Sequence, residues 1–436
     1  MRNEWNDWPE LSSRKVLNSR QLTQLNALLA ELREKNPFWK RRLHAAGIPA
    51  CPFTSLKQLQ DLPLLTKQEL VDDQQEFPPF GSNLTYPVTC YSRLHQTSGT
   101  TGRPMLWLDT PGSWDWMMEC WAQIYRLVEI RPNDIFAFPF SFGPFIGFWA
   151  AFEGAQRLGN LSLSMGGMSS ETRLKMMDEL KATIVCCTPT YALRLAEVAR
   201  QLGMNLPQLA VRMLILAGEP GAAIPSIRNR IEQDWGARAI DHWGMTDVGS
   251  LGIEPVHSPG ELALLDAQCI PEIIHPETLK PASLGETGEL IMTSLGRWGQ
   301  PVIRYRTGDL VREATTPPRE GLALLRLEGG ILGRTDDMVT IRGNNVFPSS
   351  IDAILRECEE IAEYRTTVVT RQSMSQLRIE IEPVFPVREA PERLQQLLAQ
   401  VSRQIRERLH FQAEVLAAEN LPRFDLKARR FFKSEQ

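Results

Sequence analysis

The sequence has no long apolar run, no surplus of positive charge and no paired cysteine motif. No stretch of its 436 residues approaches the about 18 consecutive apolar residues that a membrane span needs. Its net charge of -4 lacks the concentrated positive field by which proteins bind nucleic acids or anionic membranes. We therefore expect no nucleic acid and no membrane as partner, which leaves small-molecule chemistry as the leading hypothesis.

Cysteine usage excludes a disulfide framework. The 7 cysteines are an odd number, are scattered apart from Cys186 and Cys187, and form no C-x-x-C pair. We expect reduced, mostly buried thiols. The stretch RNEWNDWPEL after Met1 is polar and acidic where a secretory signal is apolar, so the expected localisation is cytoplasmic.

The chain is longer than one hydrophobic core normally allows, so at least two domains are expected. Residues 19–47 have leucines at helical spacing and predict an amphipathic helix with Ser19 as its cap and a break near Pro37. Further on, short apolar runs alternate with helix-like segments: DIFAFPF, LSLSMGG, ATIVCCTP, RMLILAGEP and ARAIDHWG. This alternation predicts β-α units around a mainly parallel sheet, with ligands at the carboxyl ends of its strands.

The pattern changes in the second half of the chain. Gly- and Glu-rich turns around GETGELIMTS and GQPVIRYRTGDLV predict antiparallel strands from about residue 260 onward. After GGILGRTDDM, helical and strand-like runs predict a small α+β domain. We place the domains at residues 1–333 and 334–436.

The stretch HQTSGTTGRPM is the most unusual segment, because residues 97–102 consist of three Thr, one Ser and two Gly. Flexible glycines let backbone N–H groups converge, and hydroxyls add donors, which together suit phosphate oxygens. It is no Walker A loop, since Gly99 and Gly102 stand too close and no Lys follows. The alternative is an ordinary Ser/Thr/Gly surface turn.

Six segments carry a resemblance to a known family. TSGTTGRP, AGEP, HWGMTD, YRTGDL, GRTDDMVTIRGNNVFPSSID and LPRFDLKARR occur in the order and at roughly the spacing seen in acyl-adenylate-forming enzymes. The chain resembles the phenylacetate-CoA ligase family in particular, from about Pro37 to its end. The resemblance implies an α/β fold: a large N-terminal acyl-adenylate-forming domain with layered sheets and helices, and a small α+β C-terminal lid domain.

The family uses ATP, Mg²⁺ and coenzyme A, and the resemblance assigns residues to the nucleotide. It places Asp309 at the ribose hydroxyls and Trp243, where the family usually has Tyr, at the adenine face; a β-turn Asp and a core Trp are the alternatives. The implied nucleotide-binding set is Thr97, Ser98, Gly99, Thr100, Thr101, Gly102, Gly218, Glu219, Pro220, Asp241, His242, Trp243, Gly244, Asp309 and Arg334.

Three residues are implied to act in the chemistry. Thr246 lies near the α-phosphate, and Asp247 stands where the family carries the Glu that helps to hold magnesium. Lys427 would offset the negative charge that builds up in the transition state. Leu426 replaces a family glycine beside it, so Lys433 is an alternative, as is a terminal lysine without a role.

The resemblance also implies an aryl pocket and a hinge. The expected pocket residues are Phe140, Phe142, Gly143, Phe145, Ile146, Met165, Gly166 and Gly167. Phe148 and Trp149 add bulk beside them, which favours a compact aryl acid or a reshaped pocket. Asp336 stands where the family has its domain pivot. The zinc site of some relatives is not expected, because His257 stands alone.

These features together imply an aryl-CoA ligase that forms an acyl-adenylate and passes the acyl group to coenzyme A. An adenylation enzyme that loads a carrier protein, and a nucleotide-binding homologue without turnover, remain as alternatives. The expected partners are an aryl carboxylic acid and coenzyme A. Both a monomer and a homodimer are left open.

Overall fold

The computed structural model describes residues 13–97, 104–317, 322–335, 339–341, 344–346, 348–371, 374–424 and 430–433. Within those ranges, no helix is both long and apolar enough to cross a membrane.

An eight-stranded sheet forms the centre of the larger part, in the order β13-β9-β8-β7-β6-β5-β3-β4. Five of its strands are parallel: β3 (Ile135–Phe138), β4 (Leu161–Ser164), β5 (Ile184–Cys187), β6 (Met213–Leu216) and β7 (Arg238–Met245). Three antiparallel strands extend it: β8 (Gly249–Ile253), β9 (Glu261–Leu264) and β13 (Arg326–Glu328). All five predicted β-α strands are confirmed.

Helices cover this sheet on both faces, which explains why its strands read as continuous apolar runs. In β5, Ile184 and Cys186 join the hydrophobic cluster that includes α4 (Pro111–Leu127) and α5 (Ile146–Arg157). Val185 and Cys187 join the cluster with α6 (Ser170–Glu179), α7 (Pro189–Gln201) and α8 (Pro225–Trp235). Alternate residues of one strand therefore serve two cores.

Smaller elements complete the larger part. An antiparallel sheet has the order β10-β11-β12-β14, with β10 (Cys269–Ile274), β11 (Thr287–Ser294), β12 (Tyr305–Arg312) and β14 (Gly333–Arg334). A hairpin of β1 (Arg93–Gln96) and β2 (Leu106–Asp109) forms a separate two-stranded sheet. The remaining helices are α1 (Arg14–Lys35), α2 (Pro37–Ala45) and α3 (Lys67–Glu76), with short 3₁₀ turns at Leu56–Asp61, Val88–Cys90 and Leu206–Gln208.

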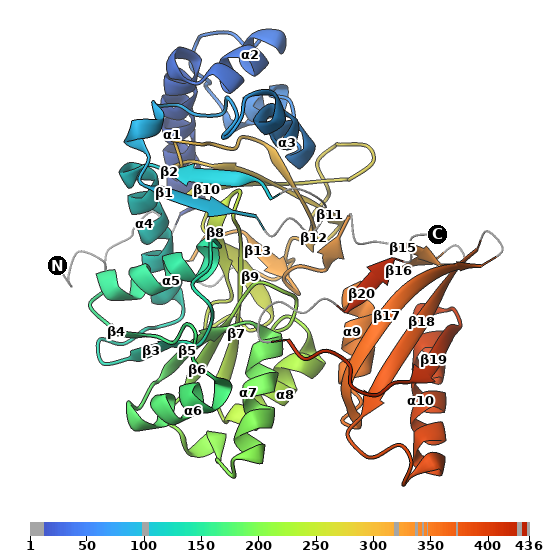
Figure 1. The fold of residues 1–436 in the computed structure, drawn as a ribbon. Coiled ribbons are helices and arrows are strands. Elements are labelled where there is room, and N and C mark those ends of the chain that lie inside the picture. Colours follow the sequence, from blue (N-terminus) through green and yellow to red (C-terminus); the bar gives the residue numbers. More distant parts are fainter. Residues whose placement is uncertain are drawn as a thin grey trace.

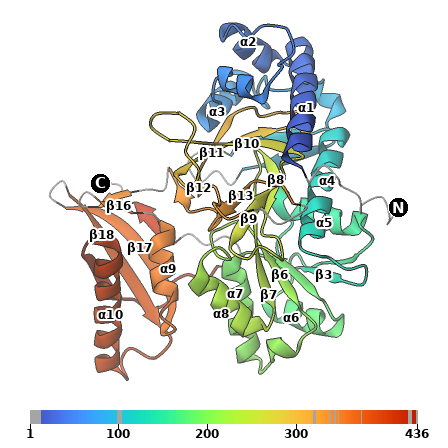
Figure 2. The same cartoon turned by 180° about the vertical axis from the view of Figure 1, so that it is seen from behind.

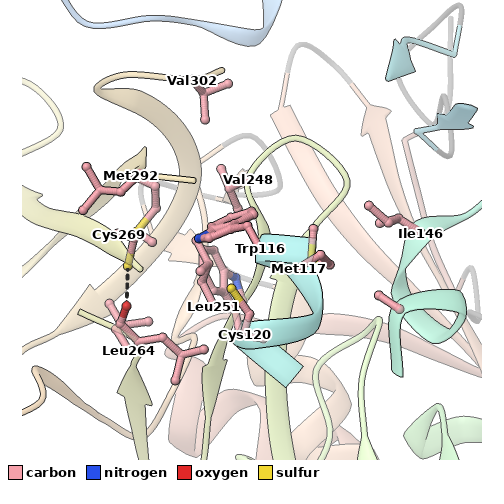
Figure 3. Close-up of a cluster of buried hydrophobic side chains, with 14 of the residues drawn as sticks. Trp116, Met117, Cys120, Ile146, Val248, Leu251, Leu264, Cys269, Met292 and Val302 are labelled. Carbon is pink, nitrogen blue, oxygen red and sulfur yellow. Dashed lines mark hydrogen bonds between the residues drawn. The ribbon is translucent and has the colours of Figure 1, made fainter. Parts of the chain in front are cut away.

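Helix α4 joins these layers through its buried face. Figure 3 shows Trp116, Met117 and Cys120 packed among side chains of the large sheet and of the β10-β11 strands, including Leu251 and Met292. One core therefore spans two sheets.

The C-terminal unit has a core of its own. Its sheet has the order β19-β18-β17-β20, built from β17 (Ile361–Arg371), β18 (Met374–Pro383), β19 (Ala413–Ala417) and β20 (Phe431–Lys433), with helices α9 (Pro348–Arg356) and α10 (Pro391–Leu409). A two-stranded ladder of β15 (Val339–Ile341) and β16 (Asn344–Val346) precedes them. In Figures 1 and 2 this orange and red unit lies beside the larger part, with α9 facing α8. The predicted α/β fold with a small α+β C-terminal domain is confirmed.

One prediction near the N-terminus was wrong. Helix α1 begins at Arg14 after Ser13, so Ser19 lies within the helix instead of capping it. The break near Pro37 is confirmed: α1 ends at Lys35, and the Asn36 side chain accepts a hydrogen bond from the Trp39 N–H at the start of α2. The boundary between residues 333 and 334 stays a prediction; backbone bonds to the larger part reach Thr335, whose N–H donates to the Gly308 carbonyl at 2.7 Å.

A fully buried ion pair fixes the hairpin against the rest of the larger part. Arg297 donates to both carboxylate oxygens of Asp109 at 2.7 Å, and neither side chain is exposed. Burial alone would raise the pKa of Asp109, yet Arg297 and His95 hold it below its usual range. The pair is therefore ionised inside the core.

Removing one partner of this pair should destabilise the protein strongly. Arg297→Met leaves Asp109 buried without its counter-charge, which should lower the free energy of unfolding by about 3–5 kcal/mol. The matched control is Arg157→Met, because the Arg157–Asp115 pair is exposed and should contribute less than about 1 kcal/mol. Urea unfolding followed by tryptophan fluorescence measures both; equal losses in the two variants would contradict the assignment.

Candidate active site

The predicted phosphate loop begins at the hairpin, beside the loop that follows β3. The Thr97 N–H donates to the Met105 carbonyl and the Thr97 hydroxyl accepts from the Met105 N–H, both at 3.0 Å. The neighbouring Gln96 N–H donates to the Pro144 carbonyl at 2.8 Å. The ends of the loop are thus held together next to the expected acyl pocket.

The Asp309 carboxylate accepts hydrogen bonds from two other residues of the predicted nucleotide-binding set. One of its oxygens accepts from the Trp243 indole N–H and the other from the Arg334 guanidinium, both at 2.8 Å. Its side chain is 5% exposed. Because β12 pairs with β14 in the register Asp309↔Arg334, the backbone itself sets this contact. Three predicted nucleotide residues from three strands therefore meet at one carboxylate.

Gly308 makes that arrangement sterically feasible. Its φ is +76°, and a Cβ there would lie 3.0 Å from an Arg334 guanidinium nitrogen. Any other residue would be strained and would press on Arg334.

Asp247 is buried just beyond the end of β7 and is held by Tyr305, the first residue of YRTGDL, for which the sequence predicted no role. The Tyr305 hydroxyl donates to Asp247 Oδ2 at 2.5 Å. Asp247 Oδ1 is buried and has no hydrogen-bond partner among the described residues. Burial raises the pKa of Asp247, while Tyr305 and the positive charges of Lys67 and Arg297 oppose that rise. Tyr305 therefore holds one carboxylate oxygen, while Oδ1 makes no hydrogen bond of ordinary geometry and the nearby Trp107 side chain favours the charged form.

Thr246 is fixed through its backbone. Its carbonyl accepts a hydrogen bond from Arg297, the same guanidinium that pairs with Asp109. The His95 ring, in the strand that leads into the phosphate loop, lies 3.8 Å from the Asp109 carboxylate. His95, Asp109 and Arg297 thus connect the strand that precedes the phosphate loop to the Thr246–Asp247 segment.

The Gly218–Pro220 turn follows β6 and packs on the start of α7. Glu219 accepts a hydrogen bond from the Thr190 N–H at 2.8 Å, while Gly218 and Pro220 are exposed. This turn lies at the carboxyl end of the parallel strands, where ligands bind in such sheets.

Asp241 and His242 differ sharply in environment although they adjoin on β7. Burial, followed by the nearby charge of Glu254, raises the pKa of Asp241 to about 7. The His242 ring stacks on Trp121 at 4.8 Å in the core, and burial lowers its pKa to about 4. Gly244, two residues on, is exposed. The contacts of all three with a nucleotide stay predictions, and the His242 ring lies against helix α4.

The expected acyl pocket is partly a packed aromatic cluster. The Phe140 ring lies 4.2 Å from that of Phe148 and 4.7 Å from that of Phe142, and Phe142 in turn meets Trp149 at 4.6 Å. The Trp149 indole donates to the Gly143 carbonyl at 3.0 Å.

The five other predicted pocket residues differ in their placement. A Cβ on Gly166 would lie 3.3 Å from the Phe142 ring. The chain after β4 therefore passes close to that ring. Gly167 is exposed, and Ile146 is buried in the same core as Phe140. The structure does not bring Phe145 and Met165 into the cluster: Phe145 is 46% exposed, and Met165 belongs to the core on the helix α6–α8 face.

Several predicted residues lie outside the described ranges. These are Ser98, Gly99, Thr100, Thr101, Gly102, Asp336 and Lys427. The described residues contain no group of three or more His, Cys, Asp or Glu side chains arranged to hold a metal ion. His257 is paired instead with Glu129 at 2.6 Å on the surface.

Comparison with known proteins supports the family that the motifs indicate. Residues 94–296 match the family model of the AMP-binding enzymes, and residues 343–434 match that of the AMP-binding enzyme C-terminal domain. A phenylacetate-coenzyme A ligase from Thermus thermophilus is 30% identical over 92% of this chain and 92% of its own length. The Escherichia coli enzyme of the same name is 31% identical over 86% and 84%.

Solved structures of a 2-hydroxyisobutyryl-CoA ligase share the fold. In its postadenylation state with 2-HIB-AMP, that ligase matches with a TM-score of 0.90 at 29% identity, over 98% of this chain and 92% of that one. In its thioesterification state with 2-HIB-AMP and CoA, the TM-score is 0.73 at the same identity, over 98% and 91%. On this sequence similarity and shared architecture, the chain belongs to the phenylacetate-coenzyme A ligase family of AMP-binding enzymes, which are acyl-adenylate-forming acid–CoA ligases.

Proposed function

We propose that this protein activates an aryl carboxylic acid with ATP and transfers the acyl group to coenzyme A. The observation that carries the proposal is the buried Asp309 carboxylate with Trp243 and Arg334 directed at it, in a chain whose curated relatives are phenylacetate-coenzyme A ligases. The acid oxygen would attack the α-phosphorus of ATP and expel pyrophosphate. The thiol of coenzyme A would then attack the acyl carbonyl and release AMP.

Each part of the site has a task in this reaction. Asp309 would accept the ribose hydroxyls beside its present donors, and Trp243 would offer a flat face to adenine. The Thr97–Gly102 loop would follow the departing pyrophosphate, and Lys427 would offset charge at the α-phosphate. Arg297 would hold the Thr246 carbonyl and so keep the Thr246 hydroxyl near that phosphate.

The residues at Asp247 fit magnesium. The buried Oδ1 without a partner is a hard, anionic oxygen of the kind that Mg²⁺ prefers. When bound, the ion would neutralise charge on the ATP phosphates. Tyr305 would fix the carboxylate by its bond to Oδ2.

A smaller, aliphatic acid is the second candidate substrate. The 2-hydroxyisobutyryl-CoA ligase matches 98% of this chain, and the packing of Phe140 on Phe148 fills part of the expected aryl pocket.

Pyrophosphate release with a panel of acids, with and without coenzyme A, tests the proposal. Phenylacetate should release pyrophosphate, and coenzyme A should be consumed in equal amount. If 2-hydroxyisobutyrate is the one acid of the panel that causes pyrophosphate release, the result would favour the second candidate. If no acid on the panel gives release above the acid-free control, ligase activity is ruled out under those conditions and the proposal fails.

Loss of the ribose acceptor should weaken ATP binding selectively. Asp309→Ala removes the hydrogen bonds that the ribose hydroxyls would donate to a charged group, each worth about 1.5–3 kcal/mol. The KM for ATP should therefore rise at least about tenfold, while the KM for the acid stays unchanged. Asp134→Ala is the matched control. Like Asp309, Asp134 is a buried carboxylate bound to an arginine, Arg212, but it lies at the amino end of β3, whereas the expected nucleotide site lies at the carboxyl ends of the strands. An unchanged ATP KM in the Asp309 variant would show that the ribose assignment is wrong.

The charge of Asp247 should set the magnesium requirement. Asp247→Asn should raise the half-saturating Mg²⁺ concentration about tenfold, equivalent to ~1.4 kcal/mol, whereas Asp247→Glu should preserve it. Titration of Mg²⁺ at saturating ATP measures both. A large loss of activity in the Glu variant would mean that the site, with Tyr305 in place, accepts only the shorter side chain.

A further inference from the structure

Aromatic rings from the loop after β3 and from the first turn of α5 gather at the carboxyl edge of the central sheet. Phe140 and Phe142 lie in the loop that follows β3. Phe148 lies in the first turn of α5. Its ring is stacked on that of Phe140, with 4.2 Å between the ring centroids and 30° between the ring planes. Phe148 therefore covers one face of Phe140.

This cluster adjoins the place where the reacting carboxylate is expected. In the same loop, the Pro144 carbonyl accepts a hydrogen bond from the Gln96 N–H at 2.8 Å, directly before the predicted phosphate loop that begins at Thr97. An acid whose carboxylate faces the ATP phosphates would extend its acyl group toward these rings. A free face of Phe140 is the surface on which an aryl group would stack there.

Two of the rings are fixed by the core around them. The Phe142 ring meets those of Trp149 and Phe152 at 4.6 and 5.2 Å. On another side it lies 3.3 Å from the position that a Cβ on Gly166 would take. Phe140 is 5% exposed. Close packing of this kind leaves Phe140 and Phe142 no room to move aside for a ligand.

Phe148 is enclosed less completely, although its backbone is anchored. Its side chain is only partly buried, at the edge of the core that contains Phe140. The adjacent Trp149 donates its indole N–H to the Gly143 carbonyl at 3.0 Å, which ties the first turn of α5 to the loop after β3. A shift of the helix therefore does not uncover Phe140. Only the Phe148 side chain itself keeps that face covered.

We propose that Phe148 is a specificity-determining residue that restricts the acyl group of the substrate to a compact one. Its ring takes the face of Phe140 on which a second ring of a larger aryl acid would stack. This inference rests on the proposed function and narrows its substrate class to acids with at most one ring. It gives Phe148 no part in the chemistry, so the use of ATP should not depend on this side chain.

Phe148→Ala tests the inference through a gain of activity, which a misfolded variant does not produce. The wild-type protein should discriminate against 2-naphthylacetate relative to the acid that it turns over best. In the variant, the ratio of kcat/KM for 2-naphthylacetate to kcat/KM for that acid should rise at least about tenfold, because the uncovered face of Phe140 admits the second ring. Initial rates of pyrophosphate release measure both, and the KM for ATP should stay unchanged.

Phe152→Ala is the matched control. Phe152 lies one turn further along α5 and is also partly buried, but its ring meets Phe138 within strand β3, at 5.2 Å. Its loss should lower stability and leave the ratio within about twofold of the wild-type value. Phe148→Leu removes the flat ring but keeps an apolar side chain in the helix, and it should raise the ratio in the same direction as Phe148→Ala.

Three results would overturn the inference while the proposed function stands. These are use of 2-naphthylacetate by the wild-type protein as efficient as that of its best acid, an unchanged ratio in both Phe148 variants, and an equal rise in the Phe152 variant. Absence of pyrophosphate release from the wild-type protein with every acid would overturn the proposed function and this inference together.

Discussion

The buried pair of Asp109 and Arg297 is the constraint around which the candidate site is organised. Asp109 ends strand β2, which closes the hairpin around the predicted phosphate loop, and Arg297 also binds the Thr246 carbonyl. A charge pair that is fully withdrawn from water keeps its geometry, because any separation leaves two ions unsolvated. The positions of Thr97 and Met105, between which the predicted loop lies, are thereby set relative to Thr246 and Asp247 by the core.

The sequence predicted the central sheet well because local pattern and tertiary structure agree there. Strands β3, β5 and β6 are short and almost entirely buried, so each one reads as an apolar run bounded by turn residues, whereas the edge strand β4 exposes Leu161. The failure at Ser19 has the opposite cause: leucine spacing marks the buried face of a helix but not its first residue. Helix α1 extends back to Arg14, where Ser13 precedes it.

The site was predictable only as far as its motifs reach. Asp309, Trp243 and Arg334 come from three quoted motifs and lie in contact, but Arg297 lies in none of those motifs, and Tyr305 was given no role although it begins YRTGDL. Their partners Asp109 and Asp247 lie 188 and 58 residues away in the sequence. The assignment of Phe145 and Met165 to the pocket stays a prediction, since packing and not composition decides which aromatic or apolar side chain faces a pocket.

The pairing of β14 with β12 also makes the two units tethered partners. Arg334 is fixed to Asp309 and the Thr335 N–H to the Gly308 carbonyl, so the chain enters the C-terminal unit from an anchored point. Docking of that unit is an intramolecular event whose effective concentration is set by a short connection. Between separate proteins a single hydrogen bond of about 1 kcal/mol would hold nothing together. On a tether, a weak contact such as the hydrogen bond from Ser226 to the Ala353 carbonyl, beside the packing of α8 on α9, contributes to the placement of the unit.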